Sequence, residues 1–255
     1  MPSRLGNIAA NAFRPGFLGT MVKKLVRRAE PDTRAAATAW ARERAESIDE
    51  WCRSVDDALW QRIVAESALL EEDAQRRVAA TGESLGGGGA HPLLSFVVQR
   101  YRPQVVVETG VAAGWSSRAI LEALRVNGAG RLYSSDFPYF RLERPERFIG
   151  VVVPEELRAD WHLDIRGDRR ALPSIVESVR RIDLFHYDSD KSVGGRRFAL
   201  DTVQPRLSPG AVVLMDDIQD NMFFADWVTR AGTPHRVFEF GGKFVGAVGL
   251  DEQRF

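Results

Sequence analysis

The sequence predicts an α/β fold built on a doubly wound, mostly parallel sheet. Short apolar runs alternate with runs of helical spacing, which is the order of βαβ units. The first apolar run consists of β-branched residues, which indicates a strand buried on both faces, as in a parallel sheet. Several of the runs end in acidic residues, and a glycine turn follows the first. These observations place a ligand site at the carboxyl edge of the sheet.

The first strand is predicted at residues 105–108, and its last residue is Glu108. Gly110 and Gly114 frame the turn that follows, before a helix over residues 117–124. Glycines at such a turn let the backbone approach a ligand closely. A dinucleotide fold would place G-x-G-x-x-G here to hold a pyrophosphate. Two glycines behind a carboxylate, which repels phosphate, instead favour a ligand with an amino group and ribose hydroxyls.

The later chain continues the alternation. Strands are predicted at residues 130–136, 161–165, 181–188 and 210–217, helices at 172–179 and 196–202, and a terminal hairpin at 238–248. The strand ends bring five acids to one edge of the sheet: Glu108, Asp136, Asp188, Asp216 and Asp217.

The region before the sheet predicts an N-terminal helical extension. Asp32 and Thr33 can cap a helix from residue 34, and residues 54–57 form a capping box for a second helix. Residues 31–85 therefore predict a helical hairpin that covers the site or builds an oligomer interface. Residues 86–89 are four glycines, which suit a linker or a lid hinge. A helix over residues 93–101 then precedes the first strand.

Composition sets limits on the protein class. The chain has 255 residues, enough for one α/β domain with an appendage, and its net charge of zero gives no overall field that would attract nucleic acid. Its single cysteine excludes an intrachain disulfide and fits a cytoplasmic location. We find no apolar run near the roughly 18 residues of a membrane span.

Residues 1–30 form a basic arm. Residues 1–28 hold six basic residues and no acid, so this segment carries +6 and the rest of the chain −6. Basic amphipathic segments bind anionic membrane surfaces weakly or bind nucleic acid. The alternatives are a partly disordered terminus or a helix docked on a partner subunit. We expect a homo-oligomer.

From about His91 onward the chain resembles the class I S-adenosylmethionine-dependent methyltransferases. Glu108-Thr109-Gly110-x-x-x-Gly114 matches their first motif and Asp136 the second. The resemblance implies that residues 86–255 form an S-adenosylmethionine-binding domain with a Rossmann-like, seven-stranded sheet whose last strand is antiparallel.

Two branches of that superfamily are similar in their later motifs. Residues 188–191, followed by residues 216–217, resemble the metal-dependent catechol and caffeoyl-CoA O-methyltransferases, and other segments resemble bacterial macrolide-sugar O-methyltransferases. The bacterial group often has His in place of Lys191, and the catechol group has Asp-Asn at 216–217. These departures leave the substrate class open.

The resemblance implies a set of residues that hold S-adenosylmethionine. They are Glu108, Gly110, Gly114, Ser116, Asp136, Phe137 and Asp168. The Glu108 turn would hold the methionine part, and Asp136 the ribose hydroxyls. Phe137 would cover the adenine face, and Asp168 would contact the adenine amino group.

Asp188, Asp216 and Asp217 predict a metal site. Three carboxylates at neighbouring strand ends repel one another, so at least one should take up a proton unless a cation neutralises them. All-oxygen ligation favours a hard divalent ion, most simply Mg²⁺. Asp183 lies at the other end of its strand and should not join them. The alternative is a metal-free site in which one aspartate bonds backbone amides.

Asp188, Lys191 and His186 are the predicted catalytic residues. A hydroxyl on the metal would have a lowered pKa, and Lys191 could take its proton if a nearby cation depressed the pKa of the lysine. Because side chains alternate along a strand, His186 should lie on the same face as Asp188. It could then support Asp188 from behind.

Together these features predict an O-methyltransferase that acts on a small-molecule or sugar hydroxyl with help from a divalent metal. Alternatives are a metal-free enzyme with Lys191 or His186 as base, an RNA-directed methyltransferase that uses the basic arm, and a non-catalytic protein at a membrane surface. The proline-rich motif of amino-group methyltransferases is absent after residues 182–188, which favours oxygen as the acceptor.

Overall fold

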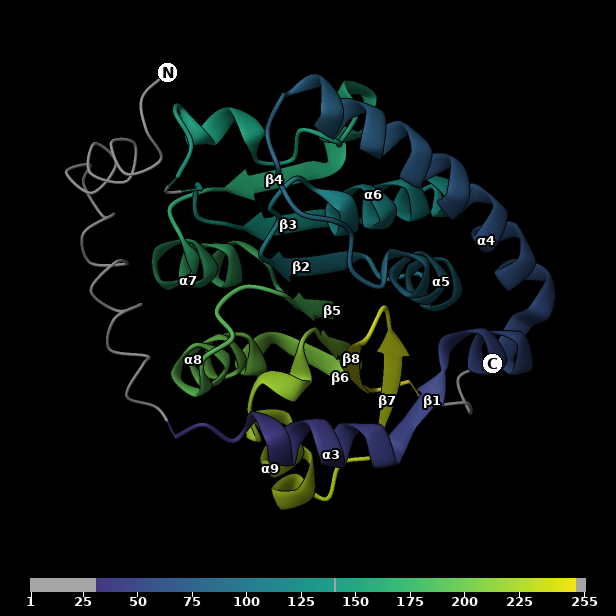
Figure 1. The fold of residues 1–255 in the computed structure, drawn as a ribbon, viewed down its shortest axis with the longest axis vertical. Helices are drawn as coiled ribbons and strands as arrows, with labels where there is room; N and C mark the ends of the chain where they lie inside the picture. The colour runs from purple at the N-terminus through teal and green to yellow at the C-terminus, as the bar shows by residue number, and fades with distance from the viewer. Residues whose placement is uncertain (1–30, 140, 251–255) are drawn as a thin grey trace.

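The computed structural model describes residues 31–139 and 141–250 of the 255-residue chain, so the predicted basic arm lies outside the described residues. One mixed sheet runs through the molecule in the order β1-β7-β8-β6-β5-β2-β3-β4 (Figure 1). The strands are β1 (Ala45–Ser47), β2 (Val105–Thr109), β3 (Arg131–Ser135), β4 (Trp161–Asp164), β5 (Ile182–Tyr187), β6 (Leu207–Met215), β7 (His235–Phe240) and β8 (Lys243–Val248). The helices are α3 (Arg34–Arg44), α4 (Ile48–Ala80), α5 (His91–Tyr101), α6 (Trp115–Asn127), α7 (Asp168–Ser178), α8 (Val193–Val203) and α9 (Phe223–Ala231).

Strands β2 to β8 confirm the predicted sheet. β2, β3, β4, β5 and β6 are parallel, and β8 runs antiparallel to both β6 and β7. This is the seven-stranded, doubly wound arrangement with a terminal hairpin. The structure adds an eighth strand, because β1 pairs with the free edge of β7 through Ala45 opposite Val237.

The N-terminal region differs from the expected hairpin at β1. Helices α3 and α4 do not pack on each other as a pair: α3 lies against α9, while α4 lies against α5. The reason is the strand between them, since an edge strand offers unpaired backbone groups that a further strand can satisfy. An ion pair of 2.6 Å between Glu46 and Arg236 supports this pairing. The second helix is interrupted at Asp56, whose carboxylate caps Leu59 at 3.0 Å.

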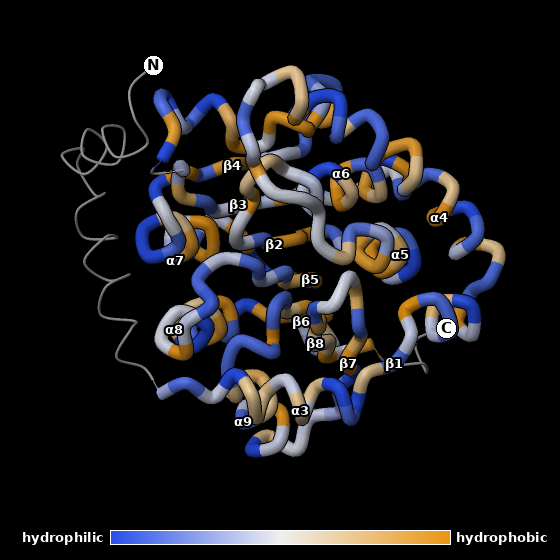
Figure 2. The backbone as a smooth tube through the Cα atoms, in the orientation of Figure 1, coloured by the Kyte–Doolittle hydropathy of each residue, from blue (hydrophilic) through white to orange (hydrophobic). Residues whose placement is uncertain are grey.

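Two apolar clusters cover the two faces of the sheet. Helices α4, α5 and α6 bury one face, with Trp51 and Phe96 among the packed rings. Helices α3, α7, α8 and α9 bury the other. Figure 1 shows α5 and α6 on one side of the central strands and α7 and α8 on the other. Hydrophobic residues gather along β2 and α5 (Figure 2). The carboxyl edge of the parallel strands is thereby left for polar residues.

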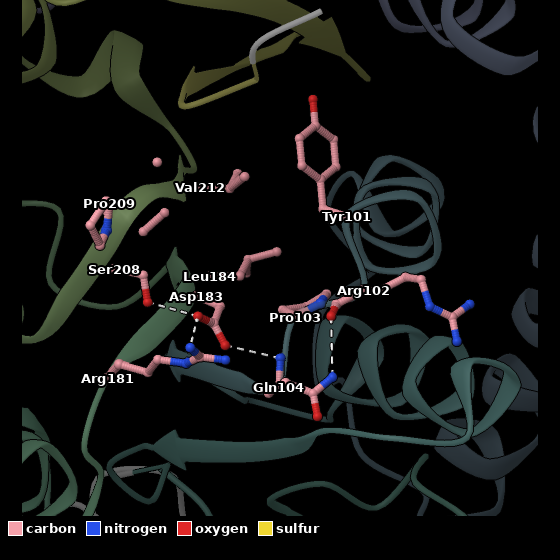
Figure 3. Close-up of a pocket in the computed structure, with 12 residues that line it drawn as sticks. Tyr101, Arg102, Pro103, Gln104, Arg181, Asp183, Leu184, Ser208, Pro209 and Val212 are labelled. Carbon is pink, nitrogen blue, oxygen red and sulfur yellow. Dashed lines mark hydrogen bonds and ion pairs between the residues drawn. The ribbon is translucent and has the colours of Figure 1, made fainter. Parts of the chain in front are cut away.

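Asp183 lies at the amino edge of the sheet, as the sequence predicts. Its carboxylate accepts hydrogen bonds from the backbone N–H groups of Gln104 (3.0 Å) and Val105 (3.1 Å) and from the Ser208 hydroxyl (2.7 Å). Figure 3 shows the contacts with Gln104 and Ser208 in a pocket at the start of β5 and β6. Asp183 therefore ties three strands together on the side away from the acidic strand ends.

Candidate active site

The turn after β2 depends on two glycines. Gly110 and Gly114 have φ angles of 84° and 98°, which favour glycine. A Cβ atom at Gly110 would collide with the Asp188 carbonyl oxygen, and one at Gly114 would lie 2.8 Å from Cα of Gly150. The two glycines therefore let the turn pass between two other loops.

Glu108 is fully buried beneath this turn, with 0% of its surface exposed. Its carboxylate accepts hydrogen bonds from the hydroxyls of Ser116 (2.6 Å), Ser117 (2.5 Å) and Ser134 (2.8 Å). Ser134 is its register partner on β3, and His186 is its register partner on β5. Glu108 thus fixes the turn to the first turn of α6. The family resemblance predicts Ser116 as a cofactor residue, whereas no motif in the sequence indicates a role for Ser117 or Ser134.

Asp136 caps the same turn from the end of β3. One carboxylate oxygen accepts from the backbone N–H groups of Val111 (3.2 Å) and Ala112 (2.6 Å), and the other accepts from that of Phe137 (2.6 Å). Burial raises the pKa of Asp136 to about 7, against the lowering effect of these amides. Asp168 and Glu108 add to the rise, because their charges repel an ionised Asp136.

Asp168 joins the ends of β3 and β5. It is the first residue of α7 and accepts hydrogen bonds from the hydroxyls of Ser135 (2.7 Å) and Ser189 (2.6 Å). The Phe137 ring lies against Gly167, where a Cβ atom would come within 2.8 Å of it. The structure therefore brings Asp136, Phe137 and Asp168 together beside the glycine turn.

A second group of charged residues follows β5 and β6. The Lys191 ammonium pairs with Asp188 and lies 3.2 Å from a carboxylate oxygen of Asp217. Lys243, the first residue of β8, lies 3.1 Å from the other oxygen of Asp217. No spacing in the sequence indicates the contribution of Lys243, because it comes from the terminal hairpin.

The pKa values of this group follow from burial and from the pairing. Burial and the nearby Asp216 raise the pKa of Asp188 to about 6. Burial alone would raise the pKa of Asp217, but Lys191 and Lys243 outweigh it and lower that pKa. Burial alone would lower the pKa of Lys191, but the carboxylates outweigh it and raise that pKa. Lys191 is therefore a protonated cation in this arrangement.

His186 lies between two carboxylates in the interior. Its Nδ1 is 3.4 Å from Glu108 Oε1 and its Nε2 is 3.5 Å from Asp216 Oδ1. Burial opposes its charge, but Asp216 and Glu108 outweigh burial and raise the pKa of His186 to about 10. Only 1% of its surface is exposed, so the imidazole is shielded from solvent beneath the acidic strand ends.

The loop that carries Asp216 and Asp217 is held from below by Arg196. This guanidinium is fully buried and donates to the carbonyl oxygens of Asp217 (2.6 Å) and Asp216 (3.4 Å). Asp217 itself has a φ of 54°, in the left-handed region that is unusual for a residue other than glycine. Such strain is often found at functional sites. No pattern in the sequence indicates this role of Arg196.

The linker of residues 86–89 passes over the same edge. A Cβ atom at Gly89 would lie 2.8 Å from a carboxylate oxygen of Asp216. Ser84 and Leu85, just before the glycines, accept hydrogen bonds from Arg141 and Tyr139 in the loop after β3, at 3.3 Å each. The linker therefore borders the acidic strand ends.

The three predicted metal ligands do not form a ready-made ligand group. Across residues 31–139 and 141–250, no three His, Cys, Asp or Glu side chains gather closely enough to hold a metal ion. The Lys191 ammonium stands between Asp188 and Asp217, and Asp216 faces His186. Over the same residues, the helices are too short or too polar for any of them to cross a membrane.

Residues 107–218 match the model of a methyltransferase domain family. No curated protein sequence matches the chain. The matched segment begins within β2, contains β3 to β6 and ends just after Asp217, so it includes the glycine turn and the charged residues from Asp188 to Asp217 but not Lys243.

Solved methyltransferase structures share the fold. An O-methyltransferase from Bacillus cereus, solved with S-adenosylhomocysteine, superposes with a TM-score of 0.54 at 15% identity, over 79% of this chain and 96% of that one. TomG from Streptomyces achromogenes, an O-methyltransferase of tomaymycin synthesis solved with S-adenosylmethionine, gives 0.53 at 18% identity, over 80% and 99%. A Staphylococcus aureus protein provisionally named a caffeoyl-CoA O-methyltransferase gives 0.52 at 9% identity, over 69% and 90%. The resemblance to the class I methyltransferase fold is thereby confirmed.

Proposed function

We propose that this protein transfers a methyl group from S-adenosylmethionine to a hydroxyl of a small molecule or sugar. The match of residues 107–218 to a methyltransferase domain family and the fold shared with solved methyltransferases support the proposal. The observation that supports the proposal is that two groups of polar residues lie side by side at one edge of the sheet. A glycine turn with Asp136 and Asp168 lies beside a charged group that contains Asp188, Lys191 and Asp217. The glycine turn with Asp136 and Asp168 would bind the methyl donor, and we call it the donor half. The charged group would bind the acceptor, and we call it the acceptor half.

On the donor side, the chain's own residues bind and orient the cofactor. The Gly110 turn, fixed from below by Glu108, would accommodate the methionine part. Asp136 would accept hydrogen bonds from the ribose hydroxyls, and Asp168 from the adenine amino group. Holding the sulfonium methyl in line with an acceptor oxygen supplies much of the rate enhancement in a two-substrate reaction.

On the acceptor side, the donor atoms and the charge of the residues suit a divalent cation, but in the structure these residues are not gathered into a ligand group. Asp188, Asp216 and Asp217 offer only hard oxygen donors, and a cation already stands between two of them in the form of the Lys191 ammonium. A divalent ion bound there would lower the pKa of the acceptor hydroxyl.

Lys191 is the proposed base for the hydroxyl proton. In its contact with Asp188 and Asp217 it is protonated and cannot accept a proton. The base role therefore requires that Lys191 leave this contact. A metal-free reaction is the second candidate, and the observation that favours it is that Lys191 already supplies positive charge at this position.

Binding of the cofactor product is the first test. We expect S-adenosylhomocysteine to bind with a free energy on the order of −5 to −8 kcal/mol, because the donor half is preformed around the glycine turn. Isothermal titration calorimetry measures this directly, with NADH as the control ligand. Tight NADH binding without any response to S-adenosylhomocysteine would contradict the proposed function.

Cofactor affinity should also depend on pH through Asp136. Its pKa of about 7 means that it is ionised above that pH and protonated below it. An ionised carboxylate accepts two hydroxyl donors, whereas a protonated one accepts less well. We therefore expect the Kd for S-adenosylhomocysteine to rise as pH falls from about 8 to about 6. In Asp136→Asn the affinity should be weaker and independent of pH over this range, and an unchanged profile in this variant would assign the dependence elsewhere.

A further inference from the structure

A groove of about 670 Å³ lies between helices α8 and α9, and we call it the α8–α9 groove. Its apolar lining includes Val193 and Leu200 from α8 and Phe223 and Trp227 from α9. Phe223 and Trp227 pack against the apolar cluster beneath them, yet both remain partly exposed. Large apolar side chains that stay open to solvent in a groove are typical of a docking surface.

The described part of the chain begins at this groove. Pro31 and Thr33 both line it. The Thr33 hydroxyl accepts a hydrogen bond from the backbone N–H of Met222 at 3.1 Å, and the Arg34 guanidinium pairs with Asp220. Both partners lie between β6 and α9, and Figure 1 shows the first described residues beside α8. These contacts fix the point at which the basic arm joins the fold, at the rim of the groove.

The sequence of the basic arm offers apolar side chains of the kind that such a groove binds. Five of them recur at the spacing of one helix face: Phe17, Leu18, Met21, Val22 and Leu25. Leu25 precedes Pro31 by six residues, and an extended chain of that length reaches at most about 20 Å. A tether this short gives the apolar face a high effective concentration at the groove.

Charge favours the same pairing. Residues 1–28 carry +6 and the rest of the chain carries −6. Asp201 and Asp226 are exposed at the groove, where Arg197 and Arg230 also lie. The two carboxylates give the lysines and arginines of the arm partners at the rim, in addition to the apolar contact. Attraction between exposed charges is screened by salt, so the apolar contact should supply most of the affinity.

We propose that the basic arm docks in the α8–α9 groove of its own chain, with the apolar side chains of residues 17–25 over Phe223 and Trp227. The occupant is the same chain because the short tether favours an intramolecular contact over one with a second copy. The docked arm covers the outer sides of α8 and α9, whose first residues follow the loops that carry Lys191 and Asp217. This inference does not depend on the proposed function.

The test is the rate at which a maleimide labels a cysteine placed in the groove of the full chain, followed by mass spectrometry. Ala231→Cys provides the reporter, because Ala231 lines the groove and is exposed. Cys52, the only native cysteine, is buried with 0% exposed and should stay unlabelled. We expect labelling at least about tenfold slower with the native arm than with Val22→Glu, because a carboxylate on the apolar face opposes docking.

Two matched controls accompany this comparison. Thr20→Glu adds the same charge to the arm but away from the apolar face, so labelling of Ala231→Cys should stay slow. Val126→Cys is the reporter outside the groove, because Val126 lies on α6 and is 58% exposed. Its labelling rate should be the same with the native arm and with Val22→Glu.

Two results would overturn the inference. Equal labelling of Ala231→Cys with the native arm and with Val22→Glu would show that the arm does not cover the groove. Slow labelling that is lost on dilution by about 100-fold would assign the groove to the arm of a second copy, since docking within one chain does not depend on protein concentration.

Discussion

Removing divalent cations with a chelator is expected to lower methyl transfer by about 10²–10⁴-fold while leaving S-adenosylhomocysteine binding intact. The reason is spatial: the proposed acceptor half contains Asp188, Asp216 and Asp217, whereas the proposed cofactor residues lie around the turn after β2 and after the ends of β3 and β4. The measurement is transfer from labelled S-adenosylmethionine to a panel of sugar and phenol hydroxyls, with chelator and after Mg²⁺ is restored.

Substitutions should show that methyl transfer depends on the carboxylates of the acceptor half and not on neighbouring acids. Asp217→Asn and Asp216→Asn are expected to reproduce the loss of transfer. Asp220→Asn is the control, because Asp220 lies on the same loop but pairs with Arg34, away from Lys191. Full activity in chelator would contradict the metal proposal and favour the metal-free reaction.

Gly110→Ala is expected to abolish cofactor binding and to destabilise the protein. The added Cβ atom would collide with the backbone carbonyl of Asp188, which cannot yield as a flexible side chain could. The φ of 84° adds strain of about 1–3 kcal/mol for a residue other than glycine. Urea unfolding would measure the loss of stability, and calorimetry with S-adenosylhomocysteine would measure the loss of binding.

Gly128→Ala separates the collision from the strain. Gly128 has a φ of 68°, and a Cβ atom there would meet nothing within 4 Å. This variant should show the conformational cost alone and should bind S-adenosylhomocysteine as the wild type does. If Gly110→Ala were no worse than Gly128→Ala in both measurements, the close approach of the two loops would not matter.

The sequence by itself determined where the strands of the doubly wound sheet lie along the chain and the edge at which the acids gather. Strand runs such as residues 105–108 and 181–188 are buried on both faces, so their hydrophobicity is visible locally. Parallel strands share one carboxyl edge, so acids at strand ends had to lie together there. The glycine turn was equally visible, because a left-handed turn after a strand requires glycine.

Other features of the site could not be predicted, because they depend on residues far apart in the chain. The sequence predicted Glu108 as a cofactor contact but not the three serine hydroxyls from α6 and β3 that enclose its carboxylate. Lys243 reaches Asp217 only because β8 inserts beside β6. Strand β1 forms because β7 is an open edge, a property of the finished sheet.

Lys191 shows most clearly what the sequence determines and what only the tertiary structure decides. Its spacing from Asp188 predicted that the two side chains lie at the same sheet edge, and in the structure the Lys191 ammonium contacts the Asp188 carboxylate. Whether it lies beside the carboxylates or between them depends on where the loop after β6 sits, and that loop is positioned by Arg196 and by Asn221. The local spacing of residues determines which side chains reach the carboxyl edge of the sheet. Long-range packing decides which charged side chains come into contact there. The reason is that electrostatic attraction depends on distances, and only the assembled fold sets those distances.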